Sequence, residues 1–129
     1  MDGNQALRLL RSLLDRKGAA WAEESGFLRF RARRGGMLWE IACRAREGEL
    51  LIYGRFPFAC REPEKARRLC ERANRVLARG ALFLGEDDAP VYRCRAELDD
   101  VYGAEDRIEK ALAYSAQVMA RYWGPLSGS

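Results

Sequence analysis

Histidine is absent from this chain of 129 residues, and that absence removes most of the familiar catalytic schemes. Ser-His-Asp and Cys-His nucleophilic mechanisms need an imidazole as general base, and many metal sites need one as a ligand. Catalysis by carboxylates or lysine remains chemically possible, but the chain has no phosphate-binding loop and no dinucleotide-binding glycine motif. We therefore expect a protein that is not an enzyme and that carries no cofactor.

The four cysteines are spread along the chain without a C-x-x-C pair, at Cys43, Cys60, Cys70 and Cys94. A zinc site needs closely spaced thiolates, or a histidine that completes the ligand set. Hydrophobic periodicity places Cys43, Cys70 and Cys94 on apolar faces, where a reduced cysteine packs as a small hydrophobic side chain. The expectation is buried thiols and no bound metal.

Adjacent acidic residues are the remaining candidates for acid–base or metal chemistry, and they occur as Glu23-Glu24, Asp87-Asp88 and Asp99-Asp100. Neighbouring residues on a strand point to opposite faces, so such pairs seldom work together as acid and base. Solvated turns are the favoured interpretation of the two aspartate pairs, and a divalent metal site is the alternative.

Positive charge dominates the electrostatics, with 23 basic and 19 acidic residues and a net charge of +4. Nearly all of the basic residues are arginines. Residues 1–60 hold 11 basic and 7 acidic groups, whereas residues 81–129 hold 5 and 9. This asymmetry favours either the steering of an anionic partner or antiparallel self-association.

Hydrophobic periodicity predicts three helices and five strands. The helices are expected at residues 4–17, 63–79 and 104–122, and the strands at residues 27–34, 37–46, 50–58, 81–85 and 90–98. Residues 21–24 fit either a short extra strand or the approach to the sheet. The order α-β-β-β-α-β-β-α predicts an α+β two-layer sandwich, with helices against an antiparallel five-stranded sheet. Residues 1–123 would form a single domain and residues 124–129 a flexible tail.

Alternation sorts the strand residues onto two faces of the predicted sheet. The apolar side chains fall on one face, which the first and third helices should cover. The opposite face collects arginines, interspersed with a few glutamates and a tyrosine. Four of these arginines are candidate contacts for acidic side chains or backbone carbonyls of a partner: Arg31, Arg33, Arg44 and Arg93.

The same basic face could instead neutralise and stack a single-stranded nucleic acid. Sheets that bind RNA usually present two or more aromatic residues, and alternation indicates only Tyr53 on this face. The interleaved glutamates also weaken the positive field. Single-stranded nucleic-acid binding is therefore the alternative to protein binding, beside a face that is merely solvated.

The second helix, residues 63–79, has a narrow stripe of mostly small apolar residues that includes Leu69, Ala73 and Val76. Small side chains permit close approach between helices. The stripe therefore fits either the core of the chain or a two-fold contact in a homodimer.

The element order resembles the type III secretion chaperone-like fold, and the segment from Leu51 to Trp123 resembles the YbjN family within it. The most similar stretch is LIYGRFPFACREPEKARRLCERANRVLARGALFLGEDDAPVYRCRAEL. There a strand ends in a G-R-F-P turn, a proline-started helix carries an asparagine near its end, and an acidic turn precedes an arginine-bearing strand. The resemblance implies homodimers that bind partner polypeptides, in a family described as regulators, with no catalytic residues to carry over.

These observations predict a non-enzymatic protein-binding module that is chaperone-like or regulatory, and a homodimer. No apolar run approaches the roughly 18 residues of a membrane span. The leucines near the N-terminus are separated by arginines and do not form the apolar segment of a signal peptide. We therefore expect a cytoplasmic protein without membrane contact, whose protein partner the sequence does not identify.

Overall fold

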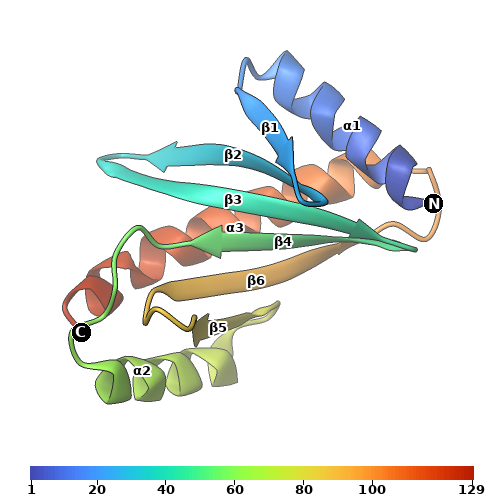
Figure 1. Ribbon diagram of the computed structural model, residues 1–129. Coiled ribbons are helices and arrows are strands. Elements are labelled where there is room, and N and C mark those ends of the chain that lie inside the picture. Colours follow the sequence, from blue (N-terminus) through green and yellow to red (C-terminus); the bar gives the residue numbers. More distant parts are fainter.

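Six strands form one antiparallel sheet in the order β1-β2-β3-β4-β6-β5 (Figure 1). The computed structural model describes all 129 residues. Along the chain the elements are α1 (Gly3–Arg16), β1 (Trp21–Glu24), β2 (Phe27–Arg34), β3 (Met37–Arg46), β4 (Glu49–Arg55), α2 (Pro63–Val76), β5 (Ala81–Leu84), β6 (Pro90–Glu97) and α3 (Ala104–Ser127). The predicted α+β class, with three helices and an antiparallel sheet, is confirmed.

The prediction of five strands is wrong by one, because Trp21–Glu24 forms strand β1 at an edge of the sheet. A two-residue turn, Ser25-Gly26, joins β1 to β2, and its φ angles are 53° and 82°. Two positive φ angles match the twist of a tight hairpin. The strand is hard to recognise in the sequence because most of its side chains are exposed and do not alternate.

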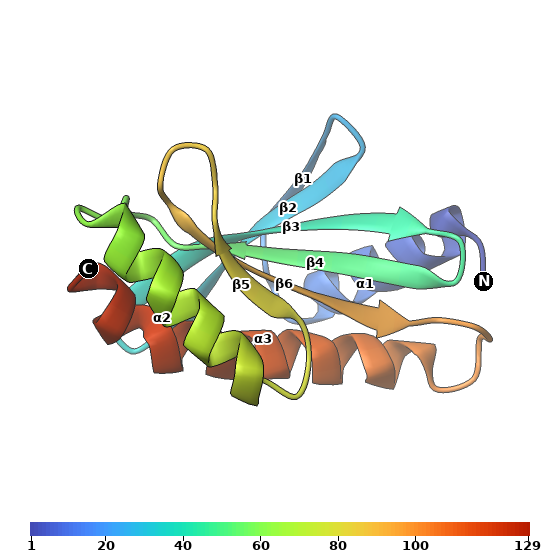
Figure 2. The same cartoon turned by 90° about the horizontal axis from the view of Figure 1, so that it is seen from below.

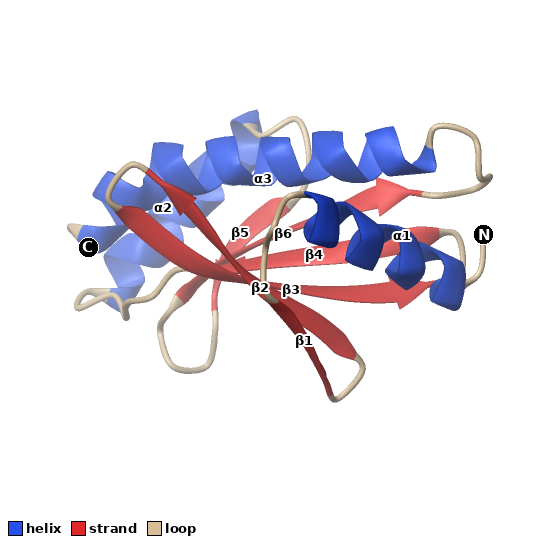
Figure 3. Ribbon diagram, turned by 90° about the horizontal axis from the view of Figure 1, so that it is seen from above, coloured by secondary structure: helices blue, strands red, loops and turns tan.

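Helices α1 and α3 lie on one face of the sheet, and no helix covers the opposite face (Figures 2 and 3). This is the predicted arrangement of the first and third helices. Helix α2 packs beside β5 and against α3. None of these helices is both long and apolar enough to cross a membrane.

The inward side chains of the strands supply the core beneath α1 and α3. Phe30 lies opposite Ile41, and Cys43, Ile52 and Cys94 form a row across β3, β4 and β6. All five are buried. Full burial of a large aliphatic or aromatic side chain contributes about 1.5–3 kcal/mol, so these rows fasten the helical layer to the sheet. The predicted division into an apolar and a basic face is confirmed.

The expectation of a flexible tail at residues 124–129 is wrong, because α3 continues to Ser127 and its end is anchored. Leu126 is fully buried. Its carbonyl accepts a hydrogen bond from the Cys60 thiol at 3.5 Å, and the Ser129 carbonyl accepts one from the Glu62 N–H at 2.6 Å. A proline inside a helix costs about 3 kcal/mol, so burial of Leu126 offsets much of the cost of Pro125.

Candidate partner-binding face

The face of the sheet that points away from α1 and α3 is the candidate binding surface, here called the open face. It consists of the outward side chains of β2, β3, β4, β5 and β6, which pair across the strands in register. All four arginines predicted as partner contacts lie on it and are exposed: Arg31, Arg33, Arg44 and Arg93.

Three arginines of the open face are neutralised by nearby carboxylates: Arg29, Arg95 and Arg55, which pairs with Asp87. The Arg29 guanidinium lies 2.8 Å from Glu40. Arg95 lies 3.0 Å from Glu49 and 3.1 Å from Glu97. Exposed pairs of this kind contribute only about 0.2–1 kcal/mol each, but they leave these arginines with little charge to offer a partner.

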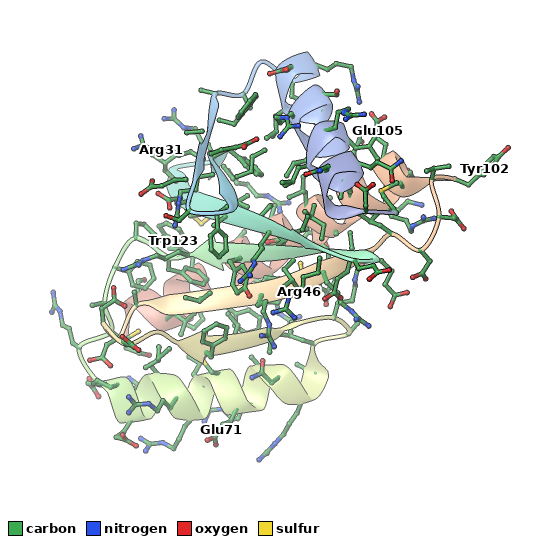
Figure 4. The ribbon with its side chains drawn as sticks, turned by 45° about the vertical axis from the view of Figure 1, so that its right-hand side comes forward. Arg31, Arg46, Glu71, Tyr102, Glu105 and Trp123 are labelled. Carbon is green, nitrogen blue, oxygen red and sulfur yellow. The ribbon has the colours of Figure 1, made fainter.

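Five other arginines of the open face have no carboxylate within 4.0 Å: Arg31, Arg33, Arg44, Arg46 and Arg93. Arg46 is not among the predicted contacts, although it follows Arg44 on the same face of β3. Arg44, Arg46 and Arg93 flank β4, whereas Arg31 and Arg33 belong to the far half of β2. Figure 4 labels Arg31 and Arg46, which lie well apart on the sheet.

An aromatic pair, Phe27 and Tyr53, lies on the open face above β3. The two ring centroids are 6.2 Å apart and the rings meet edge to face, at 71°. The guanidinium groups of Arg29 and Arg44 lie 5.5 Å and 6.0 Å from the Phe27 ring centroid. Sequence reasoning missed Phe27, although strict alternation with Arg29 places it on this face.

A basic hollow of about 890 Å³ lies where β6 extends beyond β5. Strand β5 begins at Ala81, opposite Arg93, while β6 continues to Glu97. Because β5 stops short, the end of β6 has no neighbouring strand on that side. The basic hollow is lined by fourteen residues: Arg46, Glu49, Leu51, Tyr53, Ala78, Arg79, Gly80, Ala81, Arg93, Cys94, Arg95, Glu97, Arg107 and Lys110.

Two arginines of the basic hollow are held by backbone carbonyls of β6. Arg79 donates a hydrogen bond to the Arg95 carbonyl at 3.1 Å. Arg107 donates one to the Glu97 carbonyl at 2.7 Å. These two guanidinium groups are fixed by the fold. Among the arginines of the basic hollow, Arg46 and Arg93 therefore keep donors that are free for a bound anionic group.

The thiols are poorly suited to nucleophilic or metal chemistry. All four cysteines are free and buried. Burial raises the pKa of Cys70 and of Cys94 to about 11, and it also raises the pKa of Cys43. The thiolate is the reactive and metal-binding form, so at neutral pH these side chains remain protonated.

The two aspartate pairs occupy a turn and a loop, whereas Glu23 and Glu24 are the last two residues of β1. The Ala89 N–H and the Arg55 guanidinium lower the pKa of Asp87, which belongs to the turn between β5 and β6. Asp100 pairs with Arg107 at 3.3 Å. No group of three acidic or cysteine side chains in the chain is arranged to hold a metal ion.

The predicted dimer-contact residues of α2 do not form one exposed stripe. Ala73 is buried inside the chain, and Leu69 is partly buried against the core. Only Val76 is largely exposed, at 66%. Ala73 is therefore covered by its own chain, because α2 turns its small residues toward β5 and α3.

Comparison with known proteins shows the fold of this chain but not its family. No protein-family model matches the chain, and no curated protein matches it. The crystal structure of YbjN from E. coli, a proposed transcription regulator, superposes with a TM-score of 0.66. The match covers 92% of this chain and 91% of that one, at 14% sequence identity. The chain therefore has a YbjN-like fold.

Proposed function

We propose that this domain is a non-enzymatic protein-binding module, chaperone-like or regulatory, whose open face holds an acidic segment of a partner protein. The observation that carries the proposal is the set of unpaired arginines on a sheet face that no helix covers. Arg46 and Arg93 line the basic hollow together with Tyr53, and Arg44 lies opposite Leu51, which also lines it. Arginine and tyrosine are enriched in protein interfaces, because both combine a large apolar surface with hydrogen-bond donors.

The geometry of the aromatic pair favours a polypeptide over a nucleic acid. Base stacking needs an open ring face. Two guanidinium groups already lie over Phe27, and its ring meets Tyr53 at 71°, so the two rings do not form a stacking platform. Carboxylates of a partner could replace water around the free arginines without disturbing this arrangement.

Single-stranded nucleic-acid binding is the second candidate function, because the open face has three aromatic residues and not one: Phe27, Tyr53 and the exposed Phe83 of β5. The test is the binding of a short fluorescent oligothymidine at low and moderate salt. Nucleic-acid binding should weaken steeply as salt rises. No binding at micromolar protein in low salt would eliminate this candidate.

The proposal includes a homodimer in the cytoplasm, as the resemblance to secretion chaperone-like proteins implies. Val76 is the one predicted contact on α2 that the fold leaves exposed. Sedimentation equilibrium of the wild-type protein and of Val76→Glu tests this part. If the wild-type protein is a monomer at all concentrations, the homodimer is wrong. The proposed binding by the open face does not depend on that result.

Capture of partners from cell lysate tests the binding face itself. The test variant is Arg44→Glu/Arg93→Glu, and the matched control is Arg68→Glu/Arg72→Glu, which makes the same charge change on exposed arginines of α2. The test variant should lose partners that the wild type and the control retain. Identical sets of bound proteins in all three samples would contradict the proposal.

A further inference from the structure

The sheet edge formed by β5 is closed by a side chain of α2. Leu82 turns its backbone N–H and C=O away from β6. Its N–H donates to Asn74 Oδ1 at 2.8 Å, and its carbonyl accepts from Asn74 Nδ2 at 2.9 Å. Helix α2 therefore satisfies the backbone of this edge strand, which is a common way to prevent another chain from pairing with it.

The part of β6 that extends beyond β5 has its outward carbonyls occupied. Its outward carbonyls at Arg95 and Glu97 accept the hydrogen bonds from Arg79 and Arg107. An added strand would have to displace both guanidinium groups. On this side of the sheet, the outward backbone carbonyls of β6 therefore already accept hydrogen bonds from side chains of the same chain.

The opposite edge differs, because β1 is shorter than β2. The pairing of β1 ends with Trp21 opposite Phe30, while β2 continues to Arg34 (Figure 1). Arg34 and Met37 flank a tight two-residue turn, so they form a hydrogen-bonded pair between β2 and β3. Counting back along β2 from Arg34, every second residue likewise bonds to β3. Arg33 lies between those positions, so its backbone N–H and C=O point to the open edge.

The backbone of Arg33 has no hydrogen-bond partner on that side. Outside the strand ladders, no backbone or side-chain group bonds to it. The carbonyl of Arg31 also points to this side, next to the end of β1. On the other side of the sheet, Asn74, Arg79 and Arg107 occupy outward backbone groups of Leu82, Arg95 and Glu97, whereas nothing occupies those of Arg33. We therefore call Arg31 to Arg34 the bare edge.

The charge of the bare edge selects its occupant. Arg31, Arg33 and Arg34 are exposed and have no carboxylate within 4.0 Å. A second copy pairing edge to edge would place these arginines against each other, and like charges directly opposite are destabilising. Carboxylates in the same positions are attracted, so the complementary occupant is an acidic strand.

We infer that an acidic, extended segment of a partner protein adds to the sheet as a strand beside Arg31–Arg34. This inference rests on the proposed protein-binding function and specifies how the segment is held. The residue opposite Arg33 hydrogen-bonds to the bare N–H and C=O of Arg33, and its carboxylate meets the exposed guanidinium groups of Arg31 and Arg33 on the open face. The next residue of the segment lies beside Ala32, which packs against the core, and is therefore apolar.

A pocket of about 410 Å³ at the end of β1 gives the segment room to continue. It is lined by the chain that leads into β1, including Ala20 and Trp21, by the neighbouring part of β2, and by Glu40 of β3. The pocket adjoins the point where β1 leaves β2. An added strand that runs antiparallel to β2 would reach it after passing Ala32.

The probe is a capped peptide of alternating glutamate and valine, titrated into the full-length protein and followed by fluorescence anisotropy and amide hydrogen exchange. Arg33→Ala removes a charge and keeps the backbone donor. Arg33→Pro removes both, without breaking a bond to β3, because this N–H faces the open edge. We expect Arg33→Ala to weaken binding severalfold, and Arg33→Pro to weaken it about tenfold more. The Arg33 amide should become protected when the peptide binds.

Two further measurements keep the outcomes separable. If Arg33→Pro unfolds, a peptide N-methylated at its glutamates replaces it and should bind the wild type about tenfold more weakly. Equal binding by Arg33→Ala and Arg33→Pro, without protection of the Arg33 amide, would overturn strand addition. In that case loss of binding in Arg44→Glu/Arg93→Glu would still support the proposed function. Failure of the peptide to bind the wild type, or binding of oligothymidine in its place, would overturn the inference directly.

Discussion

Asn74 makes two hydrogen bonds with the backbone of Leu82, one to its N–H at 2.8 Å and one to its carbonyl at 2.9 Å. The side-chain amide thus takes the place of a neighbouring strand at the edge of the sheet. It also connects α2 to β5, two elements that have few other polar links.

Replacement of Asn74 by alanine should lower the free energy of unfolding by about 1–3 kcal/mol, because both Leu82 groups lose their partner. The measurement is urea denaturation followed by circular dichroism. Arg72→Ala, an exposed change on the same helix, should stay within about 0.5 kcal/mol of the wild type. Equal stability of the two variants would show that water replaces the amide without cost.

Substitution of Gly80 by alanine should destabilise the fold by more than about 2 kcal/mol, through backbone strain and steric overlap. Gly80 has a φ angle of 71°, and a methyl group there would lie 2.8 Å from the Tyr92 hydroxyl and closer still to the Arg93 carbonyl. The control is Gly124→Ala, because Gly124 lies in α3 with no atom within 4 Å of the new methyl group. The control should change stability by less than about 1 kcal/mol, because the helical preference of alanine is opposed by its contact with the following Pro125. Thermal melts of the wild type and of both variants measure the two changes in stability.

Leu126→Ala should cost about 2–5 kcal/mol, the usual range for a leucine removed from a packed core. Leu126 is fully buried, although it lies only three residues before Ser129. Ser127→Ala changes the next, exposed residue and should have an effect of less than about 0.5 kcal/mol. Chemical denaturation of the pair measures the difference. A small effect at Leu126 would mean that the end of α3 contributes little to stability.

The stability of the fold should fall as pH rises from 9.0 toward 11. In the unfolded chain the thiols ionise near 9.0, whereas burial holds the pKa of Cys70 and Cys94 at about 11 in the folded protein. Between these values the folded state binds more protons than the unfolded state, so the free energy of unfolding decreases with increasing pH.

Urea midpoints at about pH 8 and about pH 10.5 test this prediction. The variant Cys70→Ala/Cys94→Ala lacks the two thiols and should lose less stability over the same interval. Lysines and tyrosines titrate in both proteins, so the difference between the two slopes reports the thiols. Parallel slopes would contradict the assignment.

Much of the fold follows from alternation within each strand. Phe30 and Ile41 are apolar at positions that must share a face, and the structure places them opposite each other in the core. The same rule placed Arg44 and Arg93 on the open face. It also contained the signal for Phe27 and Arg46, which continue the alternation by one position.

Other features had weak or misleading local signals. The strand Trp21–Glu24 has mostly exposed residues, so it lacks the alternation of a half-buried strand. The Gly-Pro and Gly-Ser pairs after Trp123 indicate a loose end, but Leu126 packs into the core and extends the helix. On α2, the small-residue stripe is equally compatible with a core and with a dimer contact, and Ala73 proved to be buried within the chain.

The sequence by itself determined which side chains face inward and which arginines face water, because side-chain direction along a strand has a period of two residues. Only the tertiary structure decided which arginines are free, which sheet edges are capped and where the basic hollow lies. Those properties depend on how far one strand extends past its neighbour and on which distant side chain reaches its backbone. The pairing of β5 with only part of β6, and of β1 with only part of β2, is a relation between strands and is not encoded in either strand alone.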